Sequence, residues 1–93
     1  MAGDKASKTV EICNALGLHA RAATKFVQLA SSFASEVGLE KDGQRVNGKS
    51  IMGLMMLAAG RGETISITTE GEDEEQAMAE LEALVTSGFG DSE

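Results

Sequence analysis

The apolar residues of this chain switch repeatedly between two spacings, and this alternation limits the folds open to it. Spacing at every second residue, typical of strands, occurs in KTVEIC (8–13) through Val10 and Ile12. Helical spacing follows over 20–33, where Phe26 belongs to one apolar stripe. The same patterns predict strands at 37–39 and 44–47 joined by an Asp42-Gly43 hairpin turn, a helix over 50–59 that stops at Gly60 and Gly62, a strand over 64–69 and a helix over 72–87.

The resulting order is β-α-β-β-α-β-α without a repeat or a linker. Helices with one apolar stripe need an apolar face to cover, so one sheet with its helices on a single side is the simplest two-layer solution. The sequence therefore predicts an α+β fold. At 93 residues the chain has room for one domain over 1–93, and we expect 1–7 and 90–93 to be frayed tails.

Charge and residue usage exclude several function classes. A net charge of −7, with no tyrosine or tryptophan, argues against nucleic-acid binding. Cys13 is the only cysteine, so an internal disulfide is impossible, and one histidine cannot complete an ordinary structural zinc site. The sequence has neither an apolar run long enough to cross a bilayer nor a secretory signal. We therefore expect a cytoplasmic protein without membrane insertion or cofactor.

The stretch GQRVNGKS (43–50) matches the phosphate-loop pattern of nucleotide-binding proteins at every fixed position. A true phosphate loop follows a buried parallel strand and opens a long helix. Here the first glycine falls in a hairpin turn, and the residues after it have the pattern of a strand. A nucleotide-binding module is thus the weakest interpretation of this segment.

A second candidate phosphate site is GLHARAA (17–23). His19 precedes the first predicted helix, so the backbone N–H groups of Ala20, Arg21 and Ala22 are expected to face its ring. A neutral imidazole nitrogen in that place can attack a phosphoryl group, and the N–H groups and Arg21 can then hold its oxygens. From the spacing alone, His19 is equally well an exposed capping residue and Arg21 an ordinary solvated side chain.

The helix over 50–59 leaves almost no polar face. Such a helix is usually buried, but a two-layer domain covers only one of its sides. We expect Ile51, Met52 and Met55 to form an exposed, adaptable patch beside His19 for partner docking, with Lys25 and Lys49 as its charged rim. Ser50 is predicted to cap this helix.

GLHARAATKFV followed by GKSIMGLMML closely resembles HPr, the histidine-containing phosphocarrier family of the bacterial phosphoenolpyruvate-dependent phosphotransferase system, and the resemblance spans about residues 8–89. It implies an open-faced β-sandwich, in which three helices cover one side of a four-stranded antiparallel sheet of order 1-4-2-3. It also implies that His19 accepts a phosphoryl group through Nδ1, that Arg21 stabilises it, and that Ser50 is a regulatory serine phosphorylated by an HPr kinase/phosphorylase.

The family implies a monomeric carrier, not an enzyme, with Enzyme I and IIA proteins as partners. Ala22 departs from the proline that most members carry after the arginine, and the TSGF ending resembles the nitrogen-type paralogue NPr. Sugar uptake and nitrogen-type regulation therefore both stay open. A more distant alternative is an acyl carrier with phosphopantetheine on Ser50, which the alternating strands oppose because such carriers are helical bundles.

Overall fold

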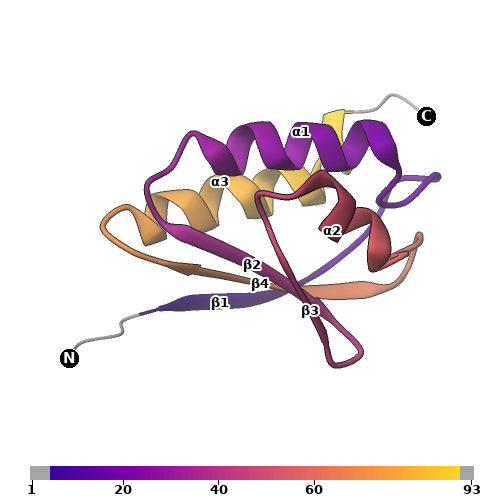
Figure 1. Cartoon of the computed structure of the whole chain (residues 1–93). Coiled ribbons are helices and arrows are strands. Elements are labelled where there is room, and N and C mark those ends of the chain that lie inside the picture. The colour runs from indigo at the N-terminus through magenta and orange to yellow at the C-terminus, as the bar shows by residue number, and fades with distance from the viewer. Residues whose placement is uncertain (1–4, 91–93) are drawn as a thin grey trace.

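A computed structural model describes residues 5–90 of the chain (Figure 1). The four strands form one sheet in the order β1-β4-β2-β3, and every neighbouring pair is antiparallel. Figure 1 shows the helices on one side of this sheet, so the predicted α+β architecture and its strand order are confirmed. The elements are β1 (Ala6–Glu11), α1 (Ala20–Ser31), β2 (Glu36–Lys41), β3 (Gln44–Asn47), α2 (Ile51–Met56), β4 (Thr64–Glu70), α3 (Glu74–Thr86) and the 3₁₀ turn η1 (Gly88–Gly90).

The core lies between the sheet and helices α1 and α3. In β4 the apolar residues alternate, so Ile65 and Ile67 point to the helices and are buried. Leu39 of β2 pairs with Ile67 in the sheet and is fully buried as well. Phe26 of α1 covers this layer with no exposed surface. The opposite face of the sheet carries polar residues such as Ser66 and Thr68 and is open to solvent.

The hairpin between β2 and β3 has the predicted turn. Asp42 and Gly43 both have positive φ angles, 52° and 83°, which is the backbone of a two-residue hairpin loop that matches the twist of its strands. Residues 44–47 then return as an antiparallel strand paired with β2. The phosphate-loop interpretation is therefore wrong, because these residues are held in a β-ladder and cannot cradle a nucleotide.

Several predicted boundaries are wrong; helix α1, for example, ends at Ser31 instead of residue 33, and α3 begins at Glu74 instead of residue 72. Helix α2 ends at Met56 instead of Ala59, because Ala58 turns the chain with a φ of 51° before either glycine is reached. Strand β1 begins at Ala6 rather than after a tail over 1–7, since Ala6 pairs with Thr69. Of the predicted C-terminal tail over 90–93, Gly90 belongs to the turn η1, and Phe89 just before it has no exposed surface. Residues 1–4 and 91–93, the rest of the predicted tails, lie outside the described range.

Asp73 joins the start of α3 to the loop between α1 and β2. It occupies the N-cap position of α3 but makes no capping hydrogen bond there. Its carboxylate instead accepts hydrogen bonds from the backbone N–H groups of Ala34 and Ser35, both at 2.9 Å, and from the Ser35 hydroxyl. The hydroxyl and the two N–H groups lower the pKa of Asp73 below its usual value, because they stabilise the charged form.

Candidate functional site

The loop before α1 is folded tightly around Gly17. This glycine has a φ of +68°, its N–H donates to the Asn14 carbonyl at 3.1 Å, and its own carbonyl accepts from the Asn14 side chain at 2.8 Å. Leu18 is buried, and its N–H donates to the carbonyl of Ala59 at 2.9 Å. The loop is thereby fixed against the segment that follows α2, and His19 is presented at the first turn of α1.

His19 is the N-cap residue of α1, as predicted. Its backbone is extended, and its carbonyl accepts the first helical hydrogen bond from Ala23 at 2.8 Å. The ring turns back over the helix start, where Nδ1 accepts the N–H of Arg21 at 3.3 Å. Nδ1 therefore carries a lone pair and no proton, and it faces the positive end of the helix dipole.

The start of α1 supplies donors for an anion on this ring. Within the described part of the chain, the N–H groups of Ala20 and Ala22 have no hydrogen-bond acceptor. Together with the Arg21 N–H they form the set of backbone donors expected at a helix N-terminus. Of the three alanines in this first turn, Ala22 and Ala23 are fully buried core residues and Ala20 is exposed.

Arg21 is exposed on the first turn of α1. Among residues 5–90, its guanidinium has no acidic partner within ion-pair distance and no hydrogen bond. The side chain is thus available to a phosphoryl group on the neighbouring His19, as its place in the sequence predicts.

The two lysines of the predicted rim bind backbone carbonyls instead. The Lys25 ammonium donates to the Phe89 carbonyl at 2.8 Å, which fixes the C-terminal turn to α1. The Lys49 ammonium donates to the Phe33 carbonyl at 3.0 Å, just beyond the end of α1. The Lys25 ammonium therefore lies at the C-terminal turn, and the Lys49 ammonium lies at the loop after α1. A further basic residue, Arg45 on β3, donates from its guanidinium to Thr68.

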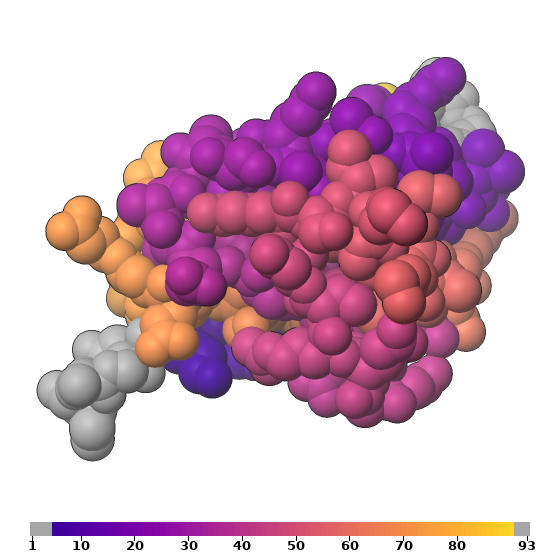
Figure 2. All heavy atoms as spheres, in the orientation of Figure 1, coloured from indigo at the N-terminus to yellow at the C-terminus, as the bar shows by residue number. Residues whose placement is uncertain are grey.

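Helix α2 presents the predicted apolar surface. Ile51, Met52 and Met55 are exposed, and Met52 keeps 75% of its surface, whereas Leu54 is fully buried and anchors the helix. Helix α2 packs along α1, and Figure 2 shows its atoms on the surface facing the viewer, against those of α1. Because the segment after α2 bonds to Leu18, this surface runs from the start of α2 toward the His19 loop.

Two further apolar side chains were missed by the sequence interpretation. Met56 is 63% exposed at the end of α2, and Leu16 is 69% exposed in the loop before His19. The exposure of Leu16 could have been predicted from the sequence, because a large apolar residue in a tight turn beside a glycine has no core to enter. The exposure of Met56 could not have been predicted in this way, since the direction of its side chain depends on where α2 ends. We call Leu16, Ile51, Met52, Met55 and Met56 the apolar patch.

Ser50 caps α2 with its own side chain. Its hydroxyl oxygen accepts the N–H of Gly53 at 3.1 Å, and the Asn47 side chain accepts the Lys49 N–H at 2.8 Å just before it. Ser50 is partly exposed and stands directly before Ile51, the first residue of the apolar patch. It lies at the opposite end of α2 from the segment that contacts the His19 loop.

Comparison with known proteins agrees with this geometry. The family model described as the PTS HPr component phosphorylation site matches residues 6–87. The chain belongs to the PTS HPr family. HPr proteins are phosphocarriers of the phosphotransferase system, so the family predicted from the two motifs is confirmed.

Individual relatives cover almost the whole chain. The phosphocarrier protein HPr of Neisseria meningitidis serogroup A is 56% identical over 86 residues, which are 92% of this chain and 97% of that protein. The phosphocarrier protein NPr of Shewanella violacea is 41% identical over 88 residues, 95% of this chain and 97% of that protein. A crystal structure of HPr from Thermoanaerobacter tengcongensis superposes with a TM-score of 0.90 at 46% identity, covering 95% and 99% of the two chains.

Proposed function

We propose that His19 accepts a phosphoryl group from Enzyme I and passes it to IIA proteins. The observation that carries this proposal is the contact of Nδ1 with the Arg21 N–H at the start of α1. The lone pair on Nδ1 would attack the phosphorus of a phosphorylated Enzyme I, forming the new N–P bond as the bond to the Enzyme I nitrogen breaks. The phosphoryl oxygens would then replace Nδ1 as acceptors for the backbone donors of α1.

In this proposal the protein contributes position and charge to the transfer. Its phosphoryl group enters from one protein and leaves to another, so the chain acts as a stoichiometric carrier and not as an enzyme. The loop around Gly17 fixes the ring, and the helix start and Arg21 stabilise the transferred group. The apolar patch is the surface on which we place both partners, because exposed methionines adapt to several binding surfaces.

The direct test is incubation with Enzyme I and phosphoenolpyruvate. We expect an adduct on His19 that is labile in acid and stable in base. His19→Ala should lose it and stay folded, since the loss of an N-cap costs about 1 kcal/mol. Arg21→Ala should accept the group roughly 10- to 100-fold more slowly, because the backbone donors stay in place. Undiminished labelling of His19→Ala would show that the acceptor lies elsewhere.

We further propose that phosphorylation of Ser50 by an HPr kinase/phosphorylase regulates this carrier. The site suits it: Ser50 is partly exposed, caps α2 and adjoins the apolar patch. A phosphate there would meet the free N–H groups at the helix start, so the fold would tolerate it. Its negative charge would instead hinder partners that bury the patch.

The sugar-transport branch of the family is the one we propose. The identity to the HPr of Neisseria meningitidis exceeds that to the NPr of Shewanella violacea, 56% against 41%. NPr-type regulation is the second candidate, which the TSGF ending favours. Transfer from labelled His19 to sugar-specific IIA proteins, compared with transfer to nitrogen-type IIA proteins, decides between them. The acyl-carrier alternative is excluded by the four-stranded sheet, because such carriers are helical bundles.

We also propose that the carrier works as a cytoplasmic monomer. In the described residues no helix has the length and apolar character needed to span a membrane. A relative has been crystallised as a dimer, the HPr of Thermoanaerobacter tengcongensis, so oligomeric state is a point to measure. Light scattering at working concentration should give the mass of one chain.

A further inference from the structure

The peptide unit between Ala59 and Gly60 is bound on both of its sides. Its C=O accepts the Leu18 N–H at 2.9 Å, and its N–H donates to Oε1 of Glu63 at 2.6 Å. A trans peptide is planar, so its C=O and N–H point in opposite directions and cannot turn independently. The Glu63 carboxylate therefore fixes the direction of the carbonyl that holds Leu18, the residue directly before His19.

The buried Ala59 side chain and a hydrogen bond to the Gly60 carbonyl restrain the residues on either side of this peptide unit. Gly60 has no side chain to hinder rotation about its backbone, and Ala58 has already left the helical conformation with a φ of 51°. Space on the other side is tight, because a Cβ on Gly17 would lie 2.6 Å from the Ala59 oxygen. Rotation of the peptide would thus move both the hydrogen bond and the packing that fix the His19 loop.

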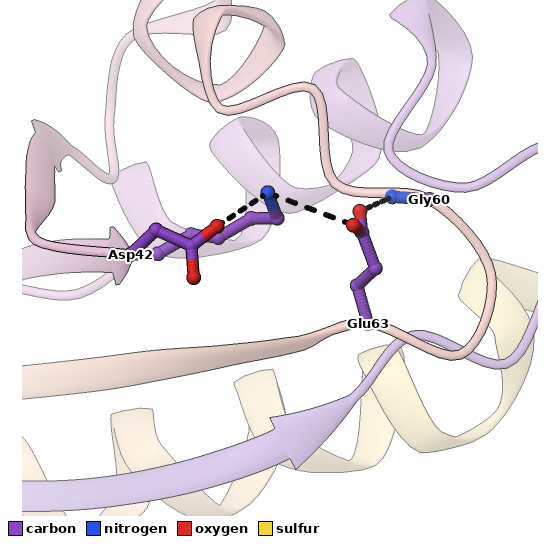
Figure 3. Close-up of polar contacts among 4 residues, drawn as sticks. Asp42, Gly60 and Glu63 are labelled. Atoms are coloured by element: carbon purple, nitrogen blue, oxygen red, sulfur yellow. Dashed lines mark hydrogen bonds and ion pairs between the residues drawn. The ribbon is translucent and has the colours of Figure 1, made fainter.

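Glu63 is itself fixed by the sheet and by a lysine. Its carbonyl accepts the Ile12 N–H at 2.8 Å, which extends the pairing of β1 with β4, and its N–H donates to the Gly60 carbonyl at 3.0 Å. Figure 3 shows the Glu63 carboxylate beside the Gly60 N–H. The Lys41 ammonium lies 3.7 Å from Oε2 of this carboxylate and donates to Asp42 at 3.1 Å.

Lys41 keeps its charge in this arrangement. Its side chain is 15% exposed. Asp42 raises the pKa of Lys41 through a hydrogen bond and through its negative charge, and Glu63 raises it as well. The Lys41 ammonium lies beside Oε2 of the Glu63 carboxylate, and a carboxylate oxygen makes a shorter and stronger hydrogen bond to an N–H group than a neutral acceptor does. The 2.6 Å contact to the Gly60 N–H has that character.

We propose that Glu63 is a positioning residue for phosphoryl transfer. It orients the Ala59-Gly60 peptide, which places Leu18 and so the ring of His19; this role rests on the proposed phosphoryl transfer at His19. Glu63 lies outside the apolar patch, and α2 ends before this segment. Removing its carboxylate should therefore lower the rate of transfer within the docked complex more than it weakens docking.

The test compares three variants in transfer from Enzyme I. Glu63→Ala should lower kcat about tenfold with little change in KM, because a small displacement of a reacting group costs that much. Glu63→Gln keeps a neutral oxygen acceptor and should recover most of the loss, within about threefold of the unmodified chain. Glu82→Ala is the matched control. It removes one negative charge from α3, where Glu82 forms an ion pair with Lys8 at 2.9 Å, and this variant should accept the phosphoryl group at the normal rate.

Amide hydrogen exchange at Leu18 supplies a readout that does not depend on transfer. Because this N–H donates to the Ala59 carbonyl, its exchange should be about tenfold faster in Glu63→Ala, about threefold faster in Glu63→Gln and unchanged in Glu82→Ala. If Glu63→Ala does not fold, the Glu63→Gln measurement carries the test alone. A chain that is never phosphorylated but shows this exchange pattern would refute the proposed function and leave the positioning of the loop standing.

Three results would overturn the proposal. The first is Leu18 exchange unaffected by either change at Glu63. The second is a rise in KM with kcat unchanged, which would assign Glu63 to docking. The third is Glu63→Gln behaving like Glu63→Ala, which would show that charge next to Lys41 matters and the hydrogen bond to Gly60 does not.

Discussion

Gly17→Ala tests the link between the His19 loop and the segment after α2. Gly17 has a φ of +68°, a conformation that costs an alanine about 1–2 kcal/mol. The new Cβ would also lie 2.6 Å from the Ala59 oxygen and 2.9 Å from the Gly60 Cα, where ordinary contact begins at 3.4 Å. Both neighbours are backbone atoms, so the loop itself has to open by about 0.8 Å to relieve the shorter contact.

That opening is enough to break a hydrogen bond. The Leu18 N–H lies 2.9 Å from the same Ala59 oxygen, and a separation near 3.6 Å is no longer a hydrogen bond. Its loss adds about 1 kcal/mol. Together with the backbone cost, Gly17→Ala should lower the free energy of unfolding by about 2–3 kcal/mol, which for a domain of this size corresponds to a Tm lower by roughly 10–20 °C.

Gly43→Ala separates the two contributions. Gly43 has a similar φ of +83°, but an added Cβ there meets nothing within 4 Å. In this control the free energy of unfolding should fall only by the backbone cost, about 1–2 kcal/mol. The variant should accept a phosphoryl group at the normal rate. Urea unfolding of both variants gives the stability difference, and transfer from Enzyme I, measured well below the lower Tm, gives the rate.

The expected result is a Gly17→Ala protein that is less stable than Gly43→Ala and transfers several-fold more slowly. Equal stability of the two variants would show that the contact with Ala59 is relieved without cost. Normal transfer in Gly17→Ala would refute the reasoning that this contact positions His19.

Three further predictions concern Phe89, Asp73 and Ser50. Phe89→Ala should lower the free energy of unfolding by about 3–5 kcal/mol in urea, because Phe89 is fully buried, whereas a frayed tail would lose nothing. Hydrogen bonds keep the folded pKa of Asp73 below its unfolded value, so its carboxylate stabilises the fold above about pH 4 and this contribution is lost as the pH falls through the folded pKa. The Tm deficit of Asp73→Asn should accordingly be largest near neutral pH and shrink below about pH 4; a deficit independent of pH would contradict this. Ser50→Asp should raise the KM of Enzyme I for this protein about threefold or more at low ionic strength with little change in kcat, and an unchanged KM would remove the apolar patch from the docking surface.

The elements with strong local signals could be predicted from the sequence. The Asp42-Gly43 turn, the alternation through Ile65 and Ile67 and the cap at His19 each depend on residues close together in the chain. Two separated motifs added the family, and with it the strand order 1-4-2-3, which the structure shows. The apolar periodicity alone predicted a two-layer fold but not which strands pair, because pairing joins residues that are far apart in sequence.

Long-range contacts decided what the local patterns could not. Lys25 and Lys49 look like free surface charges in the sequence, but each reaches a carbonyl in another segment, at Phe89 and Phe33. Phe89 sits in a glycine-rich ending that has the composition of a tail and is buried only because it packs against the folded domain.

The sequence by itself identified the family of this protein and its candidate site, and the tertiary structure determined how the residues of that site are held. A histidine before a helix with a small-residue first turn marks a candidate anion site, because the donors belong to the helix itself. The Ala59 carbonyl that binds the Leu18 N–H, and the Glu63 carboxylate that binds the Gly60 N–H, come from a segment about forty residues away along the chain. No local pattern marks such a contact, because hydrogen bonds between distant segments depend on where the sheet and helices bring the backbone.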